Sequence, residues 1–416
     1  MKNLFLFPVI ILLTALLLGS CSDDDDTTTT PVQPPVTTVA QLTTALTQIY
    51  NSSDAPGFAV SVVKNDVLLY QQAFGHADIG NDRPYTNQTI QPIGSISKTF
   101  VAAAVVKAIE QGYFTLDTDI NDILPVDLVN PNHPQETIRV RHLVTHTSGL
   151  IDRGETYLAA YHILPGEDMS SPGAQLLQAA FGAEQRATYP LDDFLAAYYL
   201  PEGDLYSTEN FASTAPGEAW NYSNIATSLT ALLVEVSTET PFPTYVKNNI
   251  LEPLGMDQTG YNLSDFDQHH VAKLYWDRDT ELPSYYNESY PDGSLNTSNE
   301  QLAMFLTDMM RGATGATGSL FTQDGYDLLF TELLPDGLVP ANFADNQGTF
   351  WFLDNNVIRH DGSDPGTTCN LEFNPTGNAG FILLTNMDAS TMEHTNAYRS
   401  LAQRVGEAIS EFIQAN

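Results

Sequence analysis

The stretch IGSISKTF, residues 93–100, sets a serine three positions before a lysine where a turn leads into an apolar run. From Ile96 to Gln111 the chain has no Pro or Gly, and apolar residues surround most of a helical circumference, which predicts a helix buried on nearly all sides. Residues i and i+3 share one helix face, about 5–6 Å apart at Cβ, so Ser95 and Lys98 could act together. The start of a helix also favours developing negative charge. In isolation, Ser95 would equally suit a helix cap.

A second Ser-x-x-Lys match, Ser61 to Lys64, lies in a different pattern. The segment GFAVSVVKNDVLLYQQAFG, residues 57–75, predicts two apolar strands around the turn KND, which form a hairpin. Successive side chains of a strand point to opposite faces, so residues i and i+3 diverge. We therefore exclude this second match as a catalytic pair.

The N-terminal residues predict export. Lys2 precedes an apolar run that is too short for a comfortable membrane span and ends in LGSC, so residues 1–20 are predicted to be a signal peptide. Its end resembles a bacterial lipobox, which would make Cys21 the lipidated N-terminus of the mature protein. The alternative is a plain signal peptide with an incidental cysteine. Residues 21–38 are rich in Asp, Thr and Pro, which predicts an extended linker.

The charge balance bears on partners and location. With 16 basic and 51 acidic residues the net charge is −35, which argues against nucleic acid as a partner. Aspartates directly behind a lipidated cysteine resemble the export signal for the outer surface of some diderm bacteria. We expect an extracytoplasmic protein, lipid-anchored to the outer membrane, at the cell surface or on the periplasmic face. Cys369, the one cysteine left after processing, lies in a strand-like pattern and is expected to be buried.

Residues 39–416 predict one domain of the α+β class. Strand patterns occur at both ends, at about residues 39–94 and 345–416, and the final residues form an amphipathic helix. Helical patterns and loops fill about residues 95–344. This arrangement predicts an antiparallel sheet built from both ends of the chain, with an inserted helical subdomain and a cleft between them.

Three further motifs follow IGSISKTF in order: VRHLVTHTSGL (residues 140–150), PGEAWNYSN (216–224) and RHDGSDPG (359–366). The ordered set resembles the class C β-lactamase-related serine hydrolases, which include low-molecular-weight penicillin-binding proteins, D-amino-acid peptidases and esterases. The resemblance covers roughly residues 40 to 415. It implies a β-lactamase/transpeptidase-like fold and acyl transfer through a serine, without metal or organic cofactor. The adjacent His269 and His270 would diverge on any element, which disfavours a metal site there.

The resemblance assigns roles to the catalytic groups. Ser95 would attack the carbonyl carbon, and either Lys98 or Tyr222 would take its proton; the sequence leaves that choice open. A nearby ammonium would favour ionisation of the Tyr222 phenol. Asn224 would donate its amide to the acyl side of the substrate.

The same resemblance places substrate-binding groups on the last motif. His360 and Gly362 would face the substrate, and the N–H groups of Ser95 and Ser363 would form the oxyanion hole. The loop that contains His146 is expected to be scaffold.

Two features depart from the β-lactamase pattern. The third motif is usually Lys-Thr-Gly, whereas this chain has His360-Asp361-Gly362, and a mostly neutral histidine suits a substrate carboxylate less well than lysine. Asp361 would raise the pKa of His360 if the two approached. The segment from the HTSGL loop to Pro216 is also long and rich in aromatic residues, so it is either an extra helical cover or a roof that selects substrate.

These features favour an esterase or a D-amino-acid peptidase or carboxypeptidase that acts on a small-molecule or peptide acyl substrate. β-Lactamase activity is one alternative. An alternative of another class is a non-catalytic lipoprotein that binds the cell wall. The sequence does not indicate an oligomeric state.

Overall fold

The computed structural model describes residues 35–416. The predicted signal peptide, Cys21 and all but the last residues of the predicted linker lie outside the described residues. Within the described part of the chain, no helix is long and apolar enough to cross a membrane.

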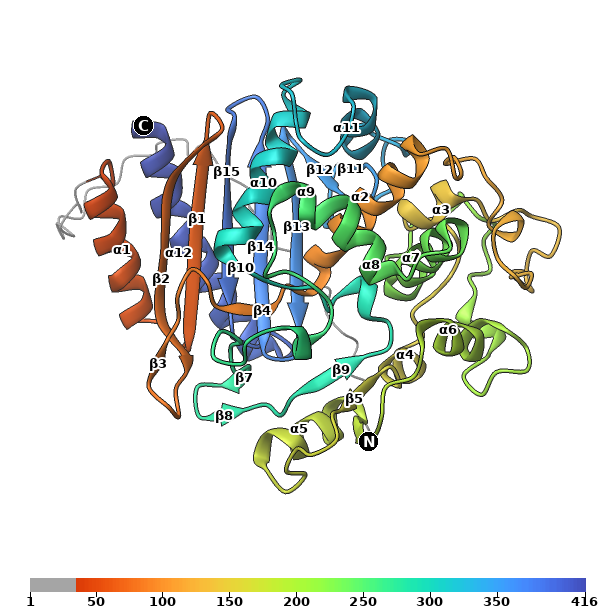
Figure 1. Ribbon diagram of the computed structural model, residues 1–416, viewed down its shortest axis with the longest axis horizontal. Coiled ribbons are helices and arrows are strands. Elements are labelled where there is room, and N and C mark those ends of the chain that lie inside the picture. Colours follow the sequence, from red (N-terminus) through yellow and green to blue (C-terminus); the bar gives the residue numbers. More distant parts are fainter. Residues whose placement is uncertain (1–34) are drawn as a thin grey trace, which may run out of the picture.

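The centre of the molecule is an eight-stranded antiparallel sheet with the order β11-β12-β13-β14-β15-β1-β2-β3 (Figure 1). Its strands are β1 (Gly57–Lys64), β2 (Val67–Asp78), β3 (Arg83–Pro84), β11 (Asn346–Gln347), β12 (Phe352–Asp354), β13 (Val357–Asp364), β14 (Thr367–Asn374) and β15 (Ala379–Thr385). The pairing of β1 with β15 runs from Phe58 opposite Thr385 to Lys64 opposite Ala379, so the two ends of the chain share one sheet.

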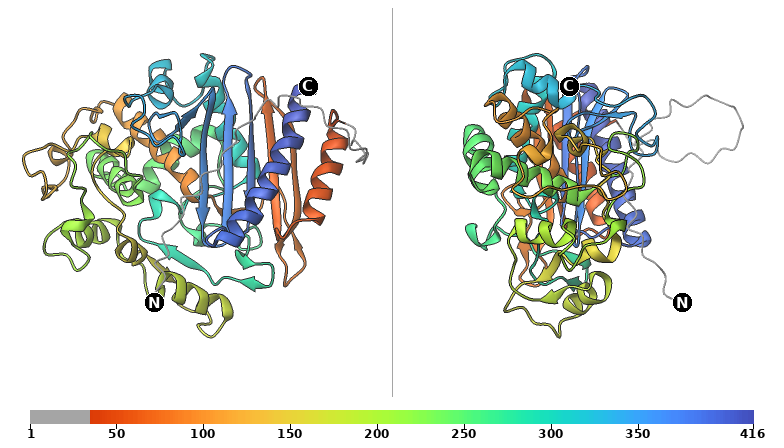
Figure 2. Two further views of the ribbon diagram at one scale, coloured as in Figure 1. Left: turned by 180° about the vertical axis from the view of Figure 1, so that it is seen from behind. Right: turned by 90° about the vertical axis from the view of Figure 1, so that its right-hand side faces the viewer.

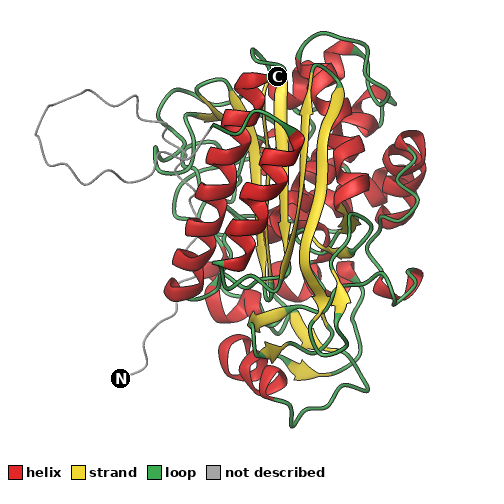
Figure 3. Ribbon diagram, turned by 90° about the vertical axis from the view of Figure 1, so that its left-hand side faces the viewer, coloured by secondary structure: helices red, strands yellow, loops and turns green. Residues whose placement is uncertain are grey.

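Two helices cover one face of this sheet, α1 (Val39–Asn51) and α12 (Met392–Ala415). Figures 2 and 3 show them side by side over the strands. Alternate β1 side chains, among them Val60 and Val62, pack into the apolar cluster between the sheet and these helices. The amphipathic stripe predicted for the end of the chain is the buried side of α12.

The rest of the helices lie on the other side of the sheet or beyond its end, with α10 directly against the strands (Figure 1). They are α2 (Ser97–Glu110), α3 (Val140–Val144), α4 (Gly154–Leu158), α5 (Pro172–Phe181), α6 (Leu191–Tyr199), α7 (Asn224–Thr238), α8 (Phe242–Val246), α9 (Glu252–Leu254), α10 (Asn299–Ala313) and α11 (Gln323–Phe330). Single-turn segments are η1 (Gly94–Ile96), η2 (Ile120–Asp122), η3 (Thr208–Asn210), η4 (Lys247–Leu251), η5 (Leu263–Asp265) and η6 (Tyr290–Asp292).

Short strands complete this helical part. They are β4 (Ile90–Pro92) paired with β10 (Asn296–Ser298), β5 (Tyr161–Ile163) between β6 (Glu184–Gln185) and β9 (Tyr285–Asn287), and β7 (Tyr275–Asp277) paired with β8 (Thr280–Glu281). The α+β class predicted from the sequence is confirmed, with a sheet from both chain ends flanked by helices.

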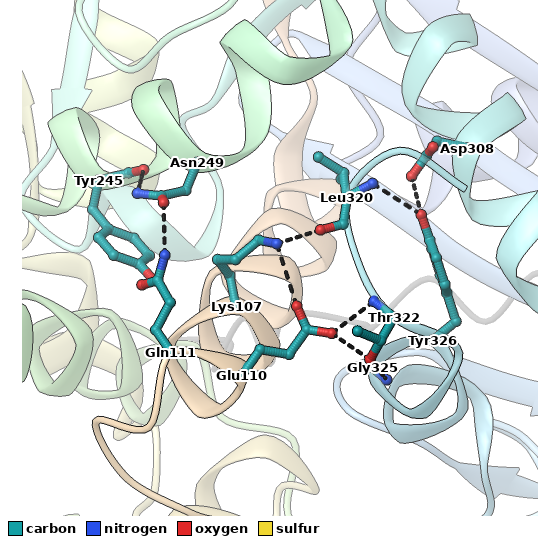
Figure 4. A network of polar contacts seen from close by, with 10 residues as sticks. All are labelled: Lys107, Glu110, Gln111, Tyr245, Asn249, Asp308, Leu320, Thr322, Gly325 and Tyr326. Atoms are coloured by element: carbon teal, nitrogen blue, oxygen red, sulfur yellow. Dashed lines mark hydrogen bonds and ion pairs between the residues drawn. The ribbon is translucent and has the colours of Figure 1, made fainter. Parts of the chain in front are cut away.

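Helix α2 is buried along most of its length, as its apolar composition predicts. Phe100 stacks on Phe305 of α10 with ring centroids 4.1 Å apart. Polar contacts fix its far end (Figure 4): Lys107 donates to the Leu320 carbonyl, and the Glu110 carboxylate accepts from the N–H of Thr322 at 2.8 Å. The helix is therefore held both by its core packing and by its C-terminal turn.

One strand is shorter than its sequence pattern predicts. GTFWFLD, residues 348–354, reads as continuous strand, but β12 covers only Phe352–Asp354. Phe350 has a left-handed backbone with φ 57°, and the N–H of Gly348 bonds to the carbonyl of Trp351 at 2.9 Å. The residues before β12 therefore form a turn that buries both aromatic rings.

Ser61 and Lys64 lie on opposite faces of β1, as the strand interpretation requires. The Ser61 hydroxyl donates to Asn299 Oδ1 at 2.8 Å on the α10 side. The Lys64 ammonium donates to the Ile413 carbonyl of α12 at 2.8 Å. The prediction that this serine and lysine cannot cooperate is confirmed.

Candidate active site

Ser95 and Lys98 meet at the start of α2. The single turn η1 carries Ser95, which is partly exposed, and the next turn carries Lys98, which is 0% exposed. Lys98 Nζ lies 3.0 Å from Ser95 Oγ, 2.7 Å from Asn224 Oδ1 and 2.8 Å from the Asp292 carbonyl oxygen. Three oxygen atoms thus surround the lysine nitrogen, and these contacts hold the side chain beside the serine.

The YSN motif enters the site at the N-terminus of α7. Ser223 caps the helix by accepting from the Ala226 N–H at 3.1 Å. Asp152, from the loop before α4, accepts from the N–H groups of Asn224 at 2.7 Å and Ile225 at 3.1 Å and from the Ser223 hydroxyl at 2.9 Å. This carboxylate binds the free N–H groups of the helix start, and it thereby holds Asn224 against Lys98.

Tyr222 lies over the same lysine. Lys98 Nζ is 5.0 Å from the centroid of the Tyr222 ring, and the His146 ring is 4.5 Å away on another side. Burial raises the pKa of Tyr222, and the opposing effects of the Lys98 charge and of Ser95 do not cancel it. The Lys98 charge lowers the pKa of Tyr222, as expected from the sequence, but burial outweighs this effect and the phenol stays protonated at neutral pH.

The third motif lies on β13, directly against the serine turn. A Cβ added to Gly362 would be 1.9 Å from the Ile93 carbonyl oxygen, and a Cβ on Gly94 would be 2.5 Å from the Ser363 nitrogen. Only glycine permits so close an approach at both positions, and Gly94 also has φ 53°. The nitrogen of Ser363 is thus brought beside the turn that carries Ser95. Among the described strands, β12 pairs only with residues 357–359 of β13, so residues 360–364 have a neighbouring strand on one edge only.

His360 is a neutral side chain in this site. Its Nδ1 lies 2.7 Å from the Asp361 carbonyl oxygen, so Nδ1 carries the proton and Nε2 is left as an acceptor. Nε2 is buried without a hydrogen-bond partner among the described residues. Burial, aided by the charge of Lys98, lowers the pKa of His360 to about 3. The Asp361 carboxylate does not reverse this, since it binds Arg359 at 2.7 Å and accepts from Asn370 at 2.6 Å.

Two buried carboxyl groups, which the sequence did not single out, lie behind the lysine and the motif strand. The Asp292 carboxyl accepts from the hydroxyls of Ser289 at 2.5 Å and Tyr157 at 3.2 Å, and burial raises its pKa to about 6. The Asp364 carboxyl accepts from the Tyr161 hydroxyl at 2.8 Å, and burial raises its pKa to about 8. At neutral pH Asp364 is therefore mostly protonated, which limits the negative charge beside the serine.

Two other residues considered in the sequence analysis, His146 and Cys369, are buried and are not exposed to a substrate. His146 is buried, and burial holds its pKa well below the usual value. Cys369 is fully buried on β14, and burial raises its pKa to about 11, so it remains a thiol. A second Tyr-x-Asn triplet also occurs in the sequence, at residues 285–287; it forms β9 and is not part of the Ser95 cluster.

Known proteins that resemble this chain in sequence or fold identify its family. A sequence model of the Beta-lactamase family matches residues 39–405, nearly all of the described chain. The chain belongs to the β-lactamase family. Among its relatives, Protein flp of Staphylococcus aureus (strain N315) is 23% identical over 351 residues, which are 82% of this chain and 62% of that protein. The chain thus spans less than two thirds of the length of that relative.

The chain is also similar to an esterase and to two proteins of solved structure. Esterase EstB of Burkholderia gladioli is 29% identical over 225 residues, which are 53% of this chain and 51% of that protein. The octameric penicillin-binding protein homologue from Pyrococcus abyssi superposes with a TM-score of 0.68 at 24% identity, covering 88% of this chain and 77% of that chain. A penicillin-binding protein from Bacillus halodurans gives a TM-score of 0.62 at 23% identity, covering 86% and 97%. These structures share the β-lactamase-family fold of this chain.

The structure brings Ser95, Lys98, Tyr222 and Asn224 together and sets β13 beside them. Sequence reasoning missed three carboxyl groups of this β-lactamase-family site: Asp152, Asp292 and Asp364. The position of Asp152 two residues after the HTSGL loop, and of Asp364 directly after Ser363, were the available signals. Asp292 has no such signal, because its backbone carbonyl makes the contact with Lys98 and any residue type could supply one.

Proposed function

We propose that the protein is a serine hydrolase that cleaves an ester or amide through an acyl-Ser95 intermediate. The observation that carries the proposal is the 3.0 Å contact between Lys98 Nζ and Ser95 Oγ, formed by a lysine fully removed from water. A nucleophile, a proton-accepting partner and a nearby backbone nitrogen are the parts that acyl transfer requires. Membership of the β-lactamase family and the partial match to an esterase support the same reading.

In the proposed reaction Ser95 Oγ forms a bond to the carbonyl carbon as its proton passes to Lys98 or Tyr222. Negative charge develops on the carbonyl oxygen, where the N–H groups of Ser95 and Ser363 would donate to it. The carbon–oxygen or carbon–nitrogen bond to the leaving group then breaks, and the transferred proton leaves on the alcohol or amine. Water adds to the acyl-Ser95 ester and returns the free serine and the acid.

The chemistry of His360 favours an ester, or a D-amino-acid peptide bond with no free carboxylate beside the reacting carbonyl, over a β-lactam. Its Nε2 is an acceptor, as is a carboxylate, so the ring does not attract the carboxylate of a β-lactam as a lysine would. The low pKa of His360 keeps the ring neutral at neutral pH. β-Lactamase activity is therefore the second candidate, favoured by the family alone.

The test exposes the intact protein to a fluorophosphonate probe and to a fluorescent penicillin. We expect labelling by the fluorophosphonate, loss of that labelling in Ser95→Ala, and weak or no labelling by the penicillin. Hydrolysis of short-chain esters, D-Ala-containing peptides and a chromogenic cephalosporin would then assign the substrate class. Absence of labelling and of hydrolysis by folded protein would contradict the proposal and favour the non-catalytic cell-wall-binding alternative.

We further propose that the protein is extracytoplasmic and lipid-anchored to the outer membrane through Cys21, at the cell surface or on the periplasmic face. The lipobox-like end of the apolar N-terminal run and the acidic residues behind it support this location. Blocking lipoprotein signal cleavage with globomycin should leave a heavier precursor. An unchanged mature mass would contradict the anchor.

A further inference from the structure

The aromatic segment between the HTSGL loop and Pro216 contacts the site through two tyrosine hydroxyls, which bond to Asp292 and Asp364. Its helix α4 carries Tyr157, and its strand β5 carries Tyr161 and pairs with β9. The two rings meet edge to face with centroids 6.1 Å apart. They are 7% and 9% exposed, so they are built into the protein rather than set on its surface.

A chain of contacts leads from Tyr157 to the catalytic lysine. The Tyr157 hydroxyl donates to the Asp292 carboxyl, at 3.3 Å from Oδ1 and 3.2 Å from Oδ2. The same Asp292 accepts from Lys98 Nζ through its backbone carbonyl at 2.8 Å. The side chain of Asp292 thus fixes the position at which its own carbonyl holds the lysine.

A parallel chain leads from Tyr161 to the motif strand. The Tyr161 hydroxyl donates to Asp364 Oδ1 at 2.8 Å, and Asp364 directly follows Ser363 at the end of β13. A Cβ on Gly293, the neighbour of Asp292, would lie 3.8 Å from Asp364 Oδ2 and 3.9 Å from the backbone of Gly94. The Asp364 carboxyl therefore lies where the serine turn and the Asp292 turn converge.

The segment itself is firmly attached. Arg186, beyond β6, donates to both carboxylate oxygens of the buried Glu288, which follows β9, and to the Ala159 carbonyl at 2.8 Å. His162 lies 3.1 Å from the same carboxylate. Since both tyrosines flank or belong to this braced region, their hydroxyls are held at fixed positions relative to β9.

We propose that Tyr157 and Tyr161 are positioning residues for acyl transfer: through Asp292 and Asp364 they hold Lys98 and the Ser363 end of β13 in register with Ser95. This inference rests on the proposed hydrolase function and assigns a role to the inserted segment. In this role the segment positions the catalytic groups and does not itself contact the substrate. A displacement of about 1 Å in such groups can cost on the order of a hundredfold in rate.

The test measures the rate at which a fluorophosphonate acylates Ser95 in Tyr157→Phe, Tyr161→Phe and Tyr199→Phe. Each change removes one hydroxyl and keeps the ring. Tyr199 is the matched control, since it lies on α6 in the same segment and its buried hydroxyl has no hydrogen-bond partner among the described residues. We expect acylation to fall about tenfold to a hundredfold in the first two variants and to stay within about twofold in the third.

The pH profile separates positioning from packing. Groups that face the Asp364 carboxyl are Tyr161 of β5, Tyr285 of β9, Asp292 of η6 and Lys98 of α2. An ionised Asp364 would oppose the charge that develops on the substrate, so the acylation rate should fall as pH rises past about 8. The Tyr161 hydroxyl stabilises the carboxylate, so Tyr161→Phe should move this fall to higher pH. A packing defect would lower the rate without moving it.

The outcomes distinguish the two claims. If the wild-type protein is not acylated at Ser95, the proposed function fails and the positioning role fails with it. If the wild type is acylated and the two variants react as fast as Tyr199→Phe, the positioning role alone is wrong. Melting temperatures within a few degrees of wild type, as expected for single hydroxyl deletions, show that the comparison is between folded proteins.

Discussion

The chain contains the Ser-x-x-Lys motif twice. One element brings the serine and lysine side chains together, and the other directs them to opposite faces. On the turn into α2, Lys98 Nζ lies 3.0 Å from Ser95 Oγ. On β1, Ser61 bonds to Asn299 of α10, while Lys64 crosses the sheet to the Ile413 carbonyl of α12. The same spacing thus brings serine and lysine into contact on a helix and separates them into two structural contacts on a strand, because the period of the backbone differs. The second site is a built-in control for the first.

The largest contrast concerns the two serines. In Ser95→Ala, hydrolysis of the best ester substrate should fall at least about a thousandfold, because the covalent intermediate cannot form. Ser61→Ala should hydrolyse it at a rate close to that of wild type. Steady-state rates of the two purified variants measure this. A hydrolysis rate of Ser95→Ala within tenfold of that of wild type would show that the two motifs do not differ in function.

The two lysines should differ by a smaller factor. Lys98→Met removes the ammonium beside Ser95 and should slow acylation by about a hundredfold to ten-thousandfold, the range for loss of a proton-transfer group. Lys64→Met removes a contact on the far face of the sheet and should leave the rate unchanged. Fluorophosphonate labelling over time gives both rates, and the circular dichroism of each variant checks its fold. Equal rates in the two variants would show that proximity to Ser95 does not matter.

The surroundings of Ser95 also predict that the free energy of unfolding depends on pH through one buried carboxyl group. Burial raises the pKa of Asp364, near Ser95, from 3.8 to about 8. Folded protein then holds a proton that the unfolded chain has lost, so this group lowers the free energy of unfolding as pH rises from about 4 to about 8, by up to about 1.4 kcal/mol per pH unit. Urea unfolding of Asp364→Asn should show a weaker loss of stability between pH 5 and pH 8 than wild type. Equal slopes would mean that Asp364 is ionised in the fold.

The smallest effect belongs to the structural serine. Ser61→Ala deletes the hydroxyl that donates to Asn299 and accepts from Gln71 Nε2 at 2.9 Å, and it should lower the free energy of unfolding by about 1–2 kcal/mol, since both hydrogen bonds are lost. Urea unfolding at neutral pH measures it. A stability equal to wild type together with reduced hydrolysis would indicate that Ser61 serves the reaction instead of the sheet.

The sequence predicted those parts of the molecule that depend on local periodicity and on ordered motifs. The helix after Ser95, the hairpin around Ser61, the strands at both ends and the fold class follow from residues close together in the chain. The resemblance also named Tyr222, Asn224 and the β13 motif, which the structure brings beside the serine.

The parts of the site that the sequence did not predict depend on contacts between segments that are distant in the chain. Asp152 reaches the start of α7 from more than 70 positions away, and Asp292 holds Lys98 with a backbone carbonyl that carries no sequence signal. The sequence predicted a neutral His360, but it could not show how far burial by distant segments lowers the pKa of His360 and raises that of Tyr222. Burial by other elements, and not the nearest charge, determines both pKa values.

The central claim is that the helix-borne serine, and not the strand-borne one, is the nucleophile. Its most direct test is to treat wild-type protein with a fluorophosphonate, digest it and locate the adduct by tandem mass spectrometry. The account predicts a single adduct on Ser95 and a sharply reduced adduct in Lys98→Met. An adduct on Ser61 or another serine, or no adduct on folded protein, would contradict it.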